Sequence, residues 1–152
     1  MPLKIALDTS FIIALLDEKD LWRAQALTLQ AALEAHETRP VVFDCVLAEA
    51  LSTLARRLHE KRRSADLSLL ISQFKSQFPK NSILWLYPDL PALYDDVIAL
   101  VEQSAGMLNF NDALIALACR DRKIPLLASF DPDFDQVAWL KRIALATDLA
   151  VP

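Results

Sequence analysis

The stretch KIALDTSFIIALL, residues 4–16, decides the fold class. Residues 4–7 are predicted to form a strand, a carboxylate and two hydroxyls follow at residues 8–10, and an apolar helical run then begins. Asp8 therefore lies where a strand ends and a helix starts. A carboxylate between Leu7 and Phe11 is unfavourable unless it is paired or binds a metal. We interpret Asp8 as a functional residue and assign the cap of the helix to Ser10.

The pattern of an apolar strand followed by a helix continues along the chain. Further strands are predicted at residues 41–43, 83–87 and 126–129, and helices at 10–16, 21–36, 45–59, 64–78, 91–104 and 111–122. Residues 136–147 are predicted to form either a helix or a pair of strands. Strands that alternate with helices indicate a mainly parallel sheet covered on both faces, a three-layer α/β/α sandwich. No composition shift or linker divides residues 1–152, so we expect a single domain.

Two residues are predicted to mark helix ends. Asp44 follows the second strand and is a plausible cap for the helix that begins at Cys45. Gly106, the only glycine, follows the helix at 91–104 and is predicted to take the left-handed position just after its end.

The composition is that of a folded protein with little general affinity for nucleic acid. Hydrophobic residues make up 54% of the chain, charged residues 24%, and the net charge is −4. Cys45 and Cys119 have no partner at metal-ligand spacing, and we expect buried free thiols. The first apolar run is cut at Asp8, which fits neither a signal peptide nor a membrane span. We expect a cytoplasmic protein.

Three further acids fall where the predicted topology brings them close to Asp8. Glu49 lies in the second turn of the helix after strand 41–43, Asp112 begins the helix at 111–122, and Asp131 follows the strand at 126–129. Since ligands bind beyond the carboxyl ends of parallel strands, we expect all four acids at one rim of the sheet. Hard divalent cations bind such oxygen ligands.

Each of these acids also has a simpler interpretation. Glu49 could be a solvated surface residue, and Asp112 could be a first-turn residue that answers the helix dipole, with Asn109 or Asn111 as the cap. Asp131 lies in an acidic turn in which Asp133 and Asp135 are alternative candidates.

A basic cluster occupies residues 56–63, two turns after Glu49. It contains Arg56, Arg57, Arg62 and Arg63, and it is either a patch that binds RNA phosphates or a solvated helix end. No other chemistry competes, because a single glycine cannot build a P-loop or a nucleophile elbow. His36 and His59 are expected to be exposed, and the Trp and Phe residues are expected to belong to the core.

The four acidic segments together resemble those of a known family. The segments DTSFIIALL, VLAEAL, LNFNDALIALA and SFDPDF, which contain Asp8, Glu49, Asp112 and Asp131, are similar in order and spacing to the acidic motifs of PIN domains. Within that family the chain resembles the VapC-type toxin ribonucleases of bacterial toxin–antitoxin pairs, and the resemblance extends from Lys4 to about Phe134. Ser129 fits the hydroxyl often found two residues before the fourth acid.

The resemblance implies both the fold and the chemistry. It implies an α/β/α fold, one or two Mg²⁺ or Mn²⁺ ions bound by the four acids, and endonucleolytic cleavage of RNA. It implies that Ser10 supports Asp8, and Asp133 remains an alternative to Asp131 as the fourth acid, because Pro132 is unusual in the family. A cognate antitoxin is the implied partner, and apolar surface near residues 21–36 and 64–78 suggests an antitoxin groove or a homodimer.

The sequence leaves two other functions open. A PIN-like RNA-processing or non-catalytic binding module would keep the fold without the reaction, but the presence of all four acids argues against it. A DNA flap nuclease or exonuclease would need additional helices to thread a strand, and 152 residues leave little space for them.

Overall fold

Five short strands form one parallel sheet in the order β3-β2-β1-β4-β5. The structure, a computed structural model, describes residues 1–150. The strands are β1 (Lys4–Leu7), β2 (Arg39–Phe43), β3 (Ile83–Leu84), β4 (Leu126–Ala128) and β5 (Lys141–Ile143). β1 lies at the centre, where Ala6 pairs with Val41 of β2 on one side and with Leu127 of β4 on the other. Every pairing is parallel, which confirms the predicted sheet.

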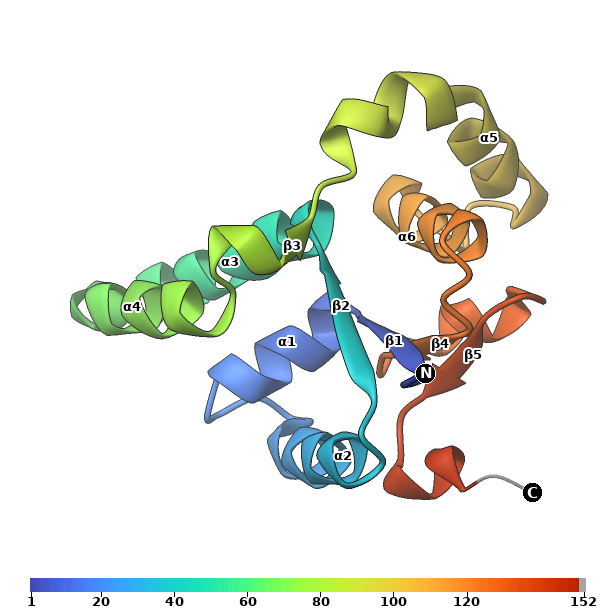
Figure 1. Cartoon of the computed structure of the whole chain (residues 1–152). Helices are drawn as coiled ribbons and strands as arrows, with labels where there is room; N and C mark the ends of the chain where they lie inside the picture. Colours follow the sequence, from blue (N-terminus) through green and yellow to red (C-terminus); the bar gives the residue numbers. More distant parts are fainter. Residues whose placement is uncertain (151–152) are drawn as a thin grey trace.

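Six helices complete the predicted three-layer α/β/α sandwich. They are α1 (Thr9–Leu16), α2 (Arg23–Ala35), α3 (Asp44–Glu60), α4 (Leu67–Gln77), α5 (Leu90–Gln103) and α6 (Phe110–Asp121). α1 and α2 lie on one side of the sheet and α5 and α6 on the other, while α3 and α4 project from the body as an arm (Figure 1). The helices predicted from the sequence are all present.

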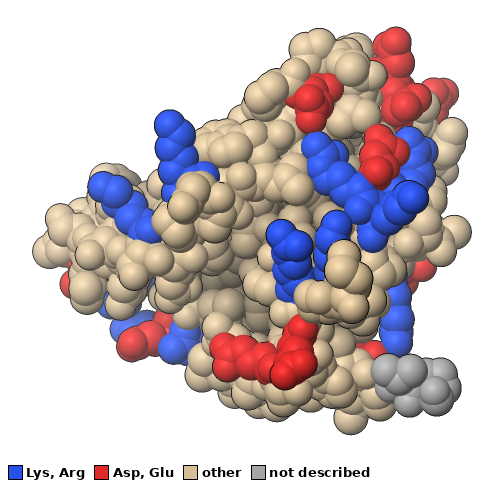
Figure 2. All heavy atoms as spheres, viewed as in Figure 1, with Lys and Arg blue, Asp and Glu red and all other residues tan. Residues whose placement is uncertain are grey.

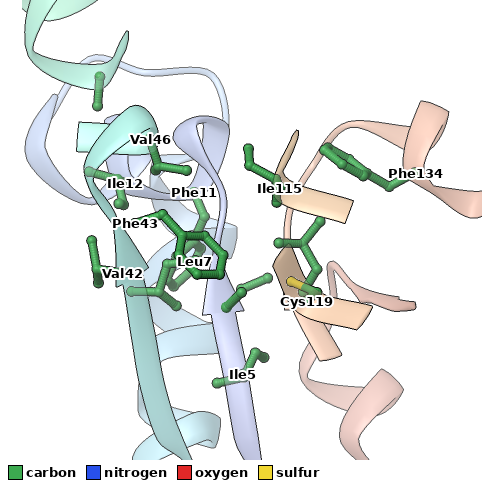
Figure 3. Packing of buried hydrophobic residues seen from close by; sticks show 14 of the residues in the cluster. Ile5, Leu7, Phe11, Ile12, Val42, Phe43, Val46, Ile115, Cys119 and Phe134 are labelled. Atoms are coloured by element: carbon green, nitrogen blue, oxygen red, sulfur yellow. The ribbon is translucent and has the colours of Figure 1, made fainter. Parts of the chain in front are cut away.

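The core is built around β1 and α6. Ile5 and Ala6 of β1 have no exposed surface, and all residues from Ala113 to Cys119 in α6 are buried. A helix that is apolar on all sides belongs in the interior. Figure 3 shows Leu7 and Phe43 packed between the strands and α1, with Ile115 and Cys119 of α6 on the other side of β1. The side chains of Cys45 and Cys119 are buried free thiols and both histidines are exposed, as expected.

The third strand is much shorter than predicted, because Asp44 turns the chain after it. The buried carboxylate of Asp44 accepts hydrogen bonds from the backbone amides of Leu86 and Tyr87, each at 2.9 Å, and from that of Cys45. The prediction of a strand over 83–87 is wrong beyond Leu84, and a 3₁₀ turn at Tyr87–Asp89 follows instead. Asp44 is the first residue of α3 and not its cap, and it joins α3 to the segment that follows β3.

Two further predictions are corrected in part or in whole. The predicted left-handed conformation of Gly106 is confirmed by its φ of 80°, but the first left-handed position after α5 is taken by Ala105, with φ of 53°. The amide of Gly106 still closes the helix end on the carbonyl of Val101, at 3.0 Å. Residues 136–147 form neither a helix nor a pair of strands, because β5 is a single strand between the 3₁₀ turns Pro132–Gln136 and Ala146–Leu149.

An apolar groove opens on the side of the sheet that carries α1 and α2. It has a volume of about 500 Å³ and is lined by residues of β1, α1, α2 and β2 and of the end of α4, among them Phe11, Leu15, Leu33, Val42 and Phe78. Figure 2 shows this face hollowed near its centre, with mainly uncharged surface in the hollow. Within residues 1–150, no helix is long and apolar enough to cross a membrane.

The hydrogen bonds of Asp44 predict a large effect of substitution on stability. Asp44→Ala leaves three backbone amides without their acceptor, two of them on the far side of the β3 connection, and we expect the free energy of unfolding to fall by roughly 2–5 kcal/mol. Urea denaturation measures this change. Asp95→Ala, which removes an exposed carboxylate from α5, is the matched control and should change stability by less than about 0.5 kcal/mol. Equal stability of the two variants would contradict the role of Asp44.

Candidate active site

One cavity at the carboxyl edge of the sheet is lined by all four acids that the sequence singled out. It has a volume of about 350 Å³, and its lining includes Asp8, Glu49, Asp112 and Asp131. The four residues come from four segments: the end of β1, the second turn of α3, the first turn of α6 and the turn after β4. The parallel sheet therefore gathers at one rim side chains that lie far apart in the sequence.

Asp8 is the most constrained of the four. The residue is 5% exposed, and its Oδ2 accepts hydrogen bonds from the hydroxyls of Ser129 at 2.6 Å and Ser10 at 3.2 Å. Its amide donates to the carbonyl of Ala128 at 3.0 Å, so the ends of β1 and β4 are joined through this residue. Asp8 precedes α1 but its side chain makes no capping hydrogen bond.

Ser10 does not cap α1 as predicted, because the helix begins at Thr9 and Ser10 lies within it. Its hydroxyl instead joins three segments of the site. It donates to Asp8, lies 3.4 Å from the hydroxyl of Ser129, and accepts a hydrogen bond from the amide of Phe130 at 3.0 Å. Ser10 therefore holds both the first acid and the turn that carries the fourth.

Asp112 both caps the start of α6 and lines the acidic cavity. It forms a capping box with Asn109, in which its amide donates to Asn109 Oδ1 at 2.9 Å and its Oδ2 accepts from the amide of Asn109 at 3.1 Å. Both residues also line the cavity. Glu49 is half-buried rather than fully solvated, and its Oε2 accepts from the side-chain amide of Asn111 at 3.3 Å. The start of α6 thus contacts the second acid as well.

Of the two candidates for the fourth acid, Asp131 lines the cavity and Asp133 does not. The amide of Asp133 donates to Asp131 Oδ1 at 2.9 Å, which orders the turn, and the amide of Asp131 donates to Ser129 Oγ at 3.0 Å. Asp135, the third acid of this turn, pairs with Arg142. Asp133 is therefore placed to support Asp131 through its backbone.

The basic cluster is split between different surroundings. Arg57 lines the cavity, but its guanidinium bridges Asp17 at 3.0 Å and Asp20 at 2.8 Å. Arg63 pairs with Asp66. Arg56 and Arg62 are at least partly exposed and carry no ion pair within residues 1–150. Two of the four arginines are therefore engaged within the protein.

Sequence reasoning singled out one further residue of the site and missed or misplaced two others. Ser129, named for its position two residues before Asp131, is fully buried and holds Asp8. Asn111 contacts Glu49, which no local pattern indicated. Trp22 was expected in the core, but it is 41% exposed and lines the cavity. The other two tryptophans, Trp85 and Trp139, are exposed as well, so that prediction is wrong for all three.

The electrostatics of the cavity follow from burial and from its excess of acids. Burial raises the pKa of Asp8, with a contribution from the charge of Asp131, while hydrogen bonds from Ser129 and Ser10 oppose the rise. Burial also raises the pKa of Asp112, to about 6, and the charges of Asp8, Asp131 and Glu49 add to the rise against the hydrogen bond from Asn109. The acids thus repel one another, and a bound cation would relieve this repulsion.

The donor set fits a hard divalent cation such as Mg²⁺ or Mn²⁺. Four carboxylates and the hydroxyl groups of the site supply oxygen ligands, and the guanidinium that lines the cavity, that of Arg57, is already paired. Thr9 Oγ1 is buried in the same lining without a hydrogen-bond partner in the described part of the chain, as an atom awaiting a ligand would be. Within residues 1–150, no three His, Cys, Asp or Glu side chains form a ready-made metal-binding group.

The raised pKa of Asp112 predicts how stability depends on pH without metal. The folded state binds this proton more tightly than the unfolded chain, where the pKa is about 3.9. The contribution of Asp112 to the free energy of unfolding in EDTA should therefore fall as pH rises from about 4 to about 6. Asp112→Asn removes this contribution and keeps the capping acceptor, so the variant should become more stable relative to wild type across that range. Parallel curves in urea denaturation at several pH values would contradict the assignment.

Comparison with known proteins agrees with this geometry. The model of the PIN domain family matches residues 5–140. No curated protein matches the chain. Among solved structures, the Mycobacterium tuberculosis VapC20 toxin, described as cleaving the sarcin–ricin loop, superposes with a TM-score of 0.64 at 23% identity, over 89% of this chain and 95% of that one. Because the family model spans most of the chain and all four acids, the protein belongs to the PIN domain family.

Proposed function

We propose that this protein is a divalent-metal-dependent endoribonuclease with Asp8, Glu49, Asp112 and Asp131 as its catalytic and metal-binding residues. The observation that carries the proposal is the convergence of these four acids on one cavity, in a chain of the PIN domain family. Bound Mg²⁺ or Mn²⁺ would supply the charge that activates a water and stabilises the phosphate during its displacement. Metal titration would distinguish one bound ion from two.

The residues around the four acids hold these carboxylates in place and orient them. Ser129 and Ser10 fix Asp8 at the end of β1, so this carboxylate offers its remaining oxygen, Oδ1, in a set direction. Asn111 orients Glu49, and the backbone of Asp133 orients Asp131. Side chains that are held in this way lose little entropy when the substrate arrives, which favours the reaction. Glu49 and Asp131, which lie on different segments, are the candidates for a proton-accepting role.

We further propose that the protein is the toxin of a toxin–antitoxin pair. The similar fold of VapC20, a toxin described as cleaving the sarcin–ricin loop, supports this proposal. The apolar groove of about 500 Å³ beside α1, α2 and the end of α4 supports a partner that docks an apolar helix or strand segment there. A homodimer remains a second way of covering this surface. Cleavage of a panel of RNAs that includes the sarcin–ricin loop would identify the substrate.

A non-catalytic RNA-binding or protein-binding module is the alternative. The capping box that engages Asp112 and the lack of a preassembled ligand group within residues 1–150 favour it. The two functions differ in their response to metal, because a cation that binds only the folded state raises its melting temperature. A binding module should show no such shift with Mg²⁺ or Mn²⁺.

Substitution of single acids tests the reaction. Asp8→Asn and Asp112→Asn should each lower Mg²⁺-dependent RNA cleavage by more than roughly 100-fold, since even outer-shell partners of a metal contribute 10–100-fold. Each variant should stay folded and show a much smaller Mn²⁺-induced rise in melting temperature than wild type. Asp95→Asn, at an exposed site on α5, serves as the charge-matched control. Wild-type cleavage by Asp112→Asn would reduce Asp112 to a helix-capping residue.

Substitution of Arg56 in α3 and Arg62 in the turn after it, which carry no ion pair within residues 1–150, tests whether the basic cluster binds RNA. Arg56→Gln with Arg62→Gln should weaken binding of single-stranded RNA and lower the slope of log K against log salt by roughly 0.7 for each phosphate that the protein no longer neutralises. The pair Lys80→Gln and Lys123→Gln removes the same charge from positions elsewhere on the surface and should leave the slope near that of wild type. Equal slopes for both variants would identify the cluster as a solvated helix end.

A further inference from the structure

We propose that Trp22 is a stacking platform that holds a base of single-stranded RNA beside the acidic cavity. Trp22 lines the same cavity as Asp8 and Asp131, and 41% of the residue is exposed. The inference rests on the proposed function and deepens it, since it adds a residue that positions the substrate.

The indole is held flat by an aromatic stack beneath it. Its ring lies nearly parallel to that of Phe130, with an interplanar angle of 11° and 5.1 Å between centroids, and the centroid of Phe130 lies 6.1 Å from that of Phe11. Phe130 and Phe11 are buried, so the inner face of Trp22 is covered by the core. Phe130 directly precedes Asp131 in the chain, which couples the indole to the turn that carries the fourth acid.

The backbone around the indole is fixed from two directions. The amide of Trp22 donates to Asp20 Oδ2 at 3.0 Å, and Asp20 is in turn bridged by Arg57 at 2.8 Å. On the other side, the amide of Phe130 donates to Ser10 Oγ at 3.0 Å. Arg57, which also lines the cavity, therefore anchors the loop of Trp22 to α3.

An exposed aromatic face beside a site proposed to cleave RNA phosphodiesters is suited to stacking against a nucleobase. Single-stranded RNA is commonly recognised by stacking of unpaired bases on aromatic side chains, and any base offers a π-face for this purpose. A purely structural Trp22 would only cover Phe130 from water. The two roles differ in what they predict for the substrate, because only the stacking role depends on a base at a defined position of the RNA.

Steady-state cleavage of a single-stranded oligoribonucleotide tests the proposal. Trp22→Ala should raise KM roughly 5- to 100-fold, the range expected when one base–aromatic stack is removed, with a smaller change in kcat. Trp22→Phe should restore much of the wild-type KM. Trp85→Ala, at a tryptophan of similar exposure that does not line the cavity, is the matched control and should behave like wild type. A wild-type KM for Trp22→Ala, or a Trp22→Phe variant as impaired as Trp22→Ala, overturns the proposal.

An abasic substrate separates stacking from a structural effect. One abasic substitution near the scissile phosphate should raise KM for wild type but have little further effect on Trp22→Ala, because both changes remove the same interaction. Additive effects at every position tested overturn the proposal.

Fluorescence keeps the inference distinct from the nuclease assignment. In Asp8→Asn with Trp85→Phe and Trp139→Phe, Trp22 is the only tryptophan, and bound RNA should quench its emission more than an abasic RNA of equal length. RNA binding without a change in emission overturns the stacking platform alone. If wild type cleaves no RNA, the nuclease assignment falls, while base-dependent quenching would still support the platform.

Discussion

The hydrogen bond between Ser129 and the buried carboxylate of Asp8 is the interaction on which the site depends. It joins the ends of two neighbouring parallel strands, β1 and β4, at the edge where their side chains leave the sheet. A buried charge without partners would be strongly unfavourable, and hydroxyl donors reduce that penalty without neutralising the negative charge. An arginine at the same place would stabilise Asp8 better but would remove its attraction for a cation. The use of two serines thus orders the carboxylate without placing a positive charge beside it.

The parts of the fold that follow from local pattern could be predicted from the sequence. Apolar runs bounded by polar residues located β1 and β4, and the alternation of strands with helices indicated a parallel sheet and therefore the rim at which the acids meet. The prediction of a strand at 83–87 was wrong because its end is set by Asp44, which lies far earlier in the chain and holds the amides of Leu86 and Tyr87. No short window along the chain contains both partners of such an interaction.

The site, like the fold, could be predicted where it depends on local sequence pattern, but not where it depends on contacts between distant segments. The residue types and their strand-end positions indicated which carboxylates would gather, but not which atoms hold them. Ser10 was wrongly assigned to the helix cap, and only the family resemblance implied its contact with Asp8. Its contact with the amide of Phe130, far along the chain, was not predicted. Trp22 was expected in the core with the other Trp and Phe residues, but its ring is stacked on the buried Phe130 and lines the cavity. Side-chain partners are thus a tertiary property, while placement on a rim is a topological one.

The two outer strands of the sheet also bear on aggregation. β3 has two residues and β5 has three, and β5 presents Lys141 and Arg142, so neither edge offers a long apolar row of free amides and carbonyls to a second chain. Proteins blunt exposed sheet edges with short strands and charged side chains, because a long flat edge is a template for aggregation. The sequence is 54% hydrophobic, and its most deeply buried apolar strands, β1 and β4, lie inside the sheet. Lengthening β3, or replacing the charges of β5 by apolar residues, would create such a template.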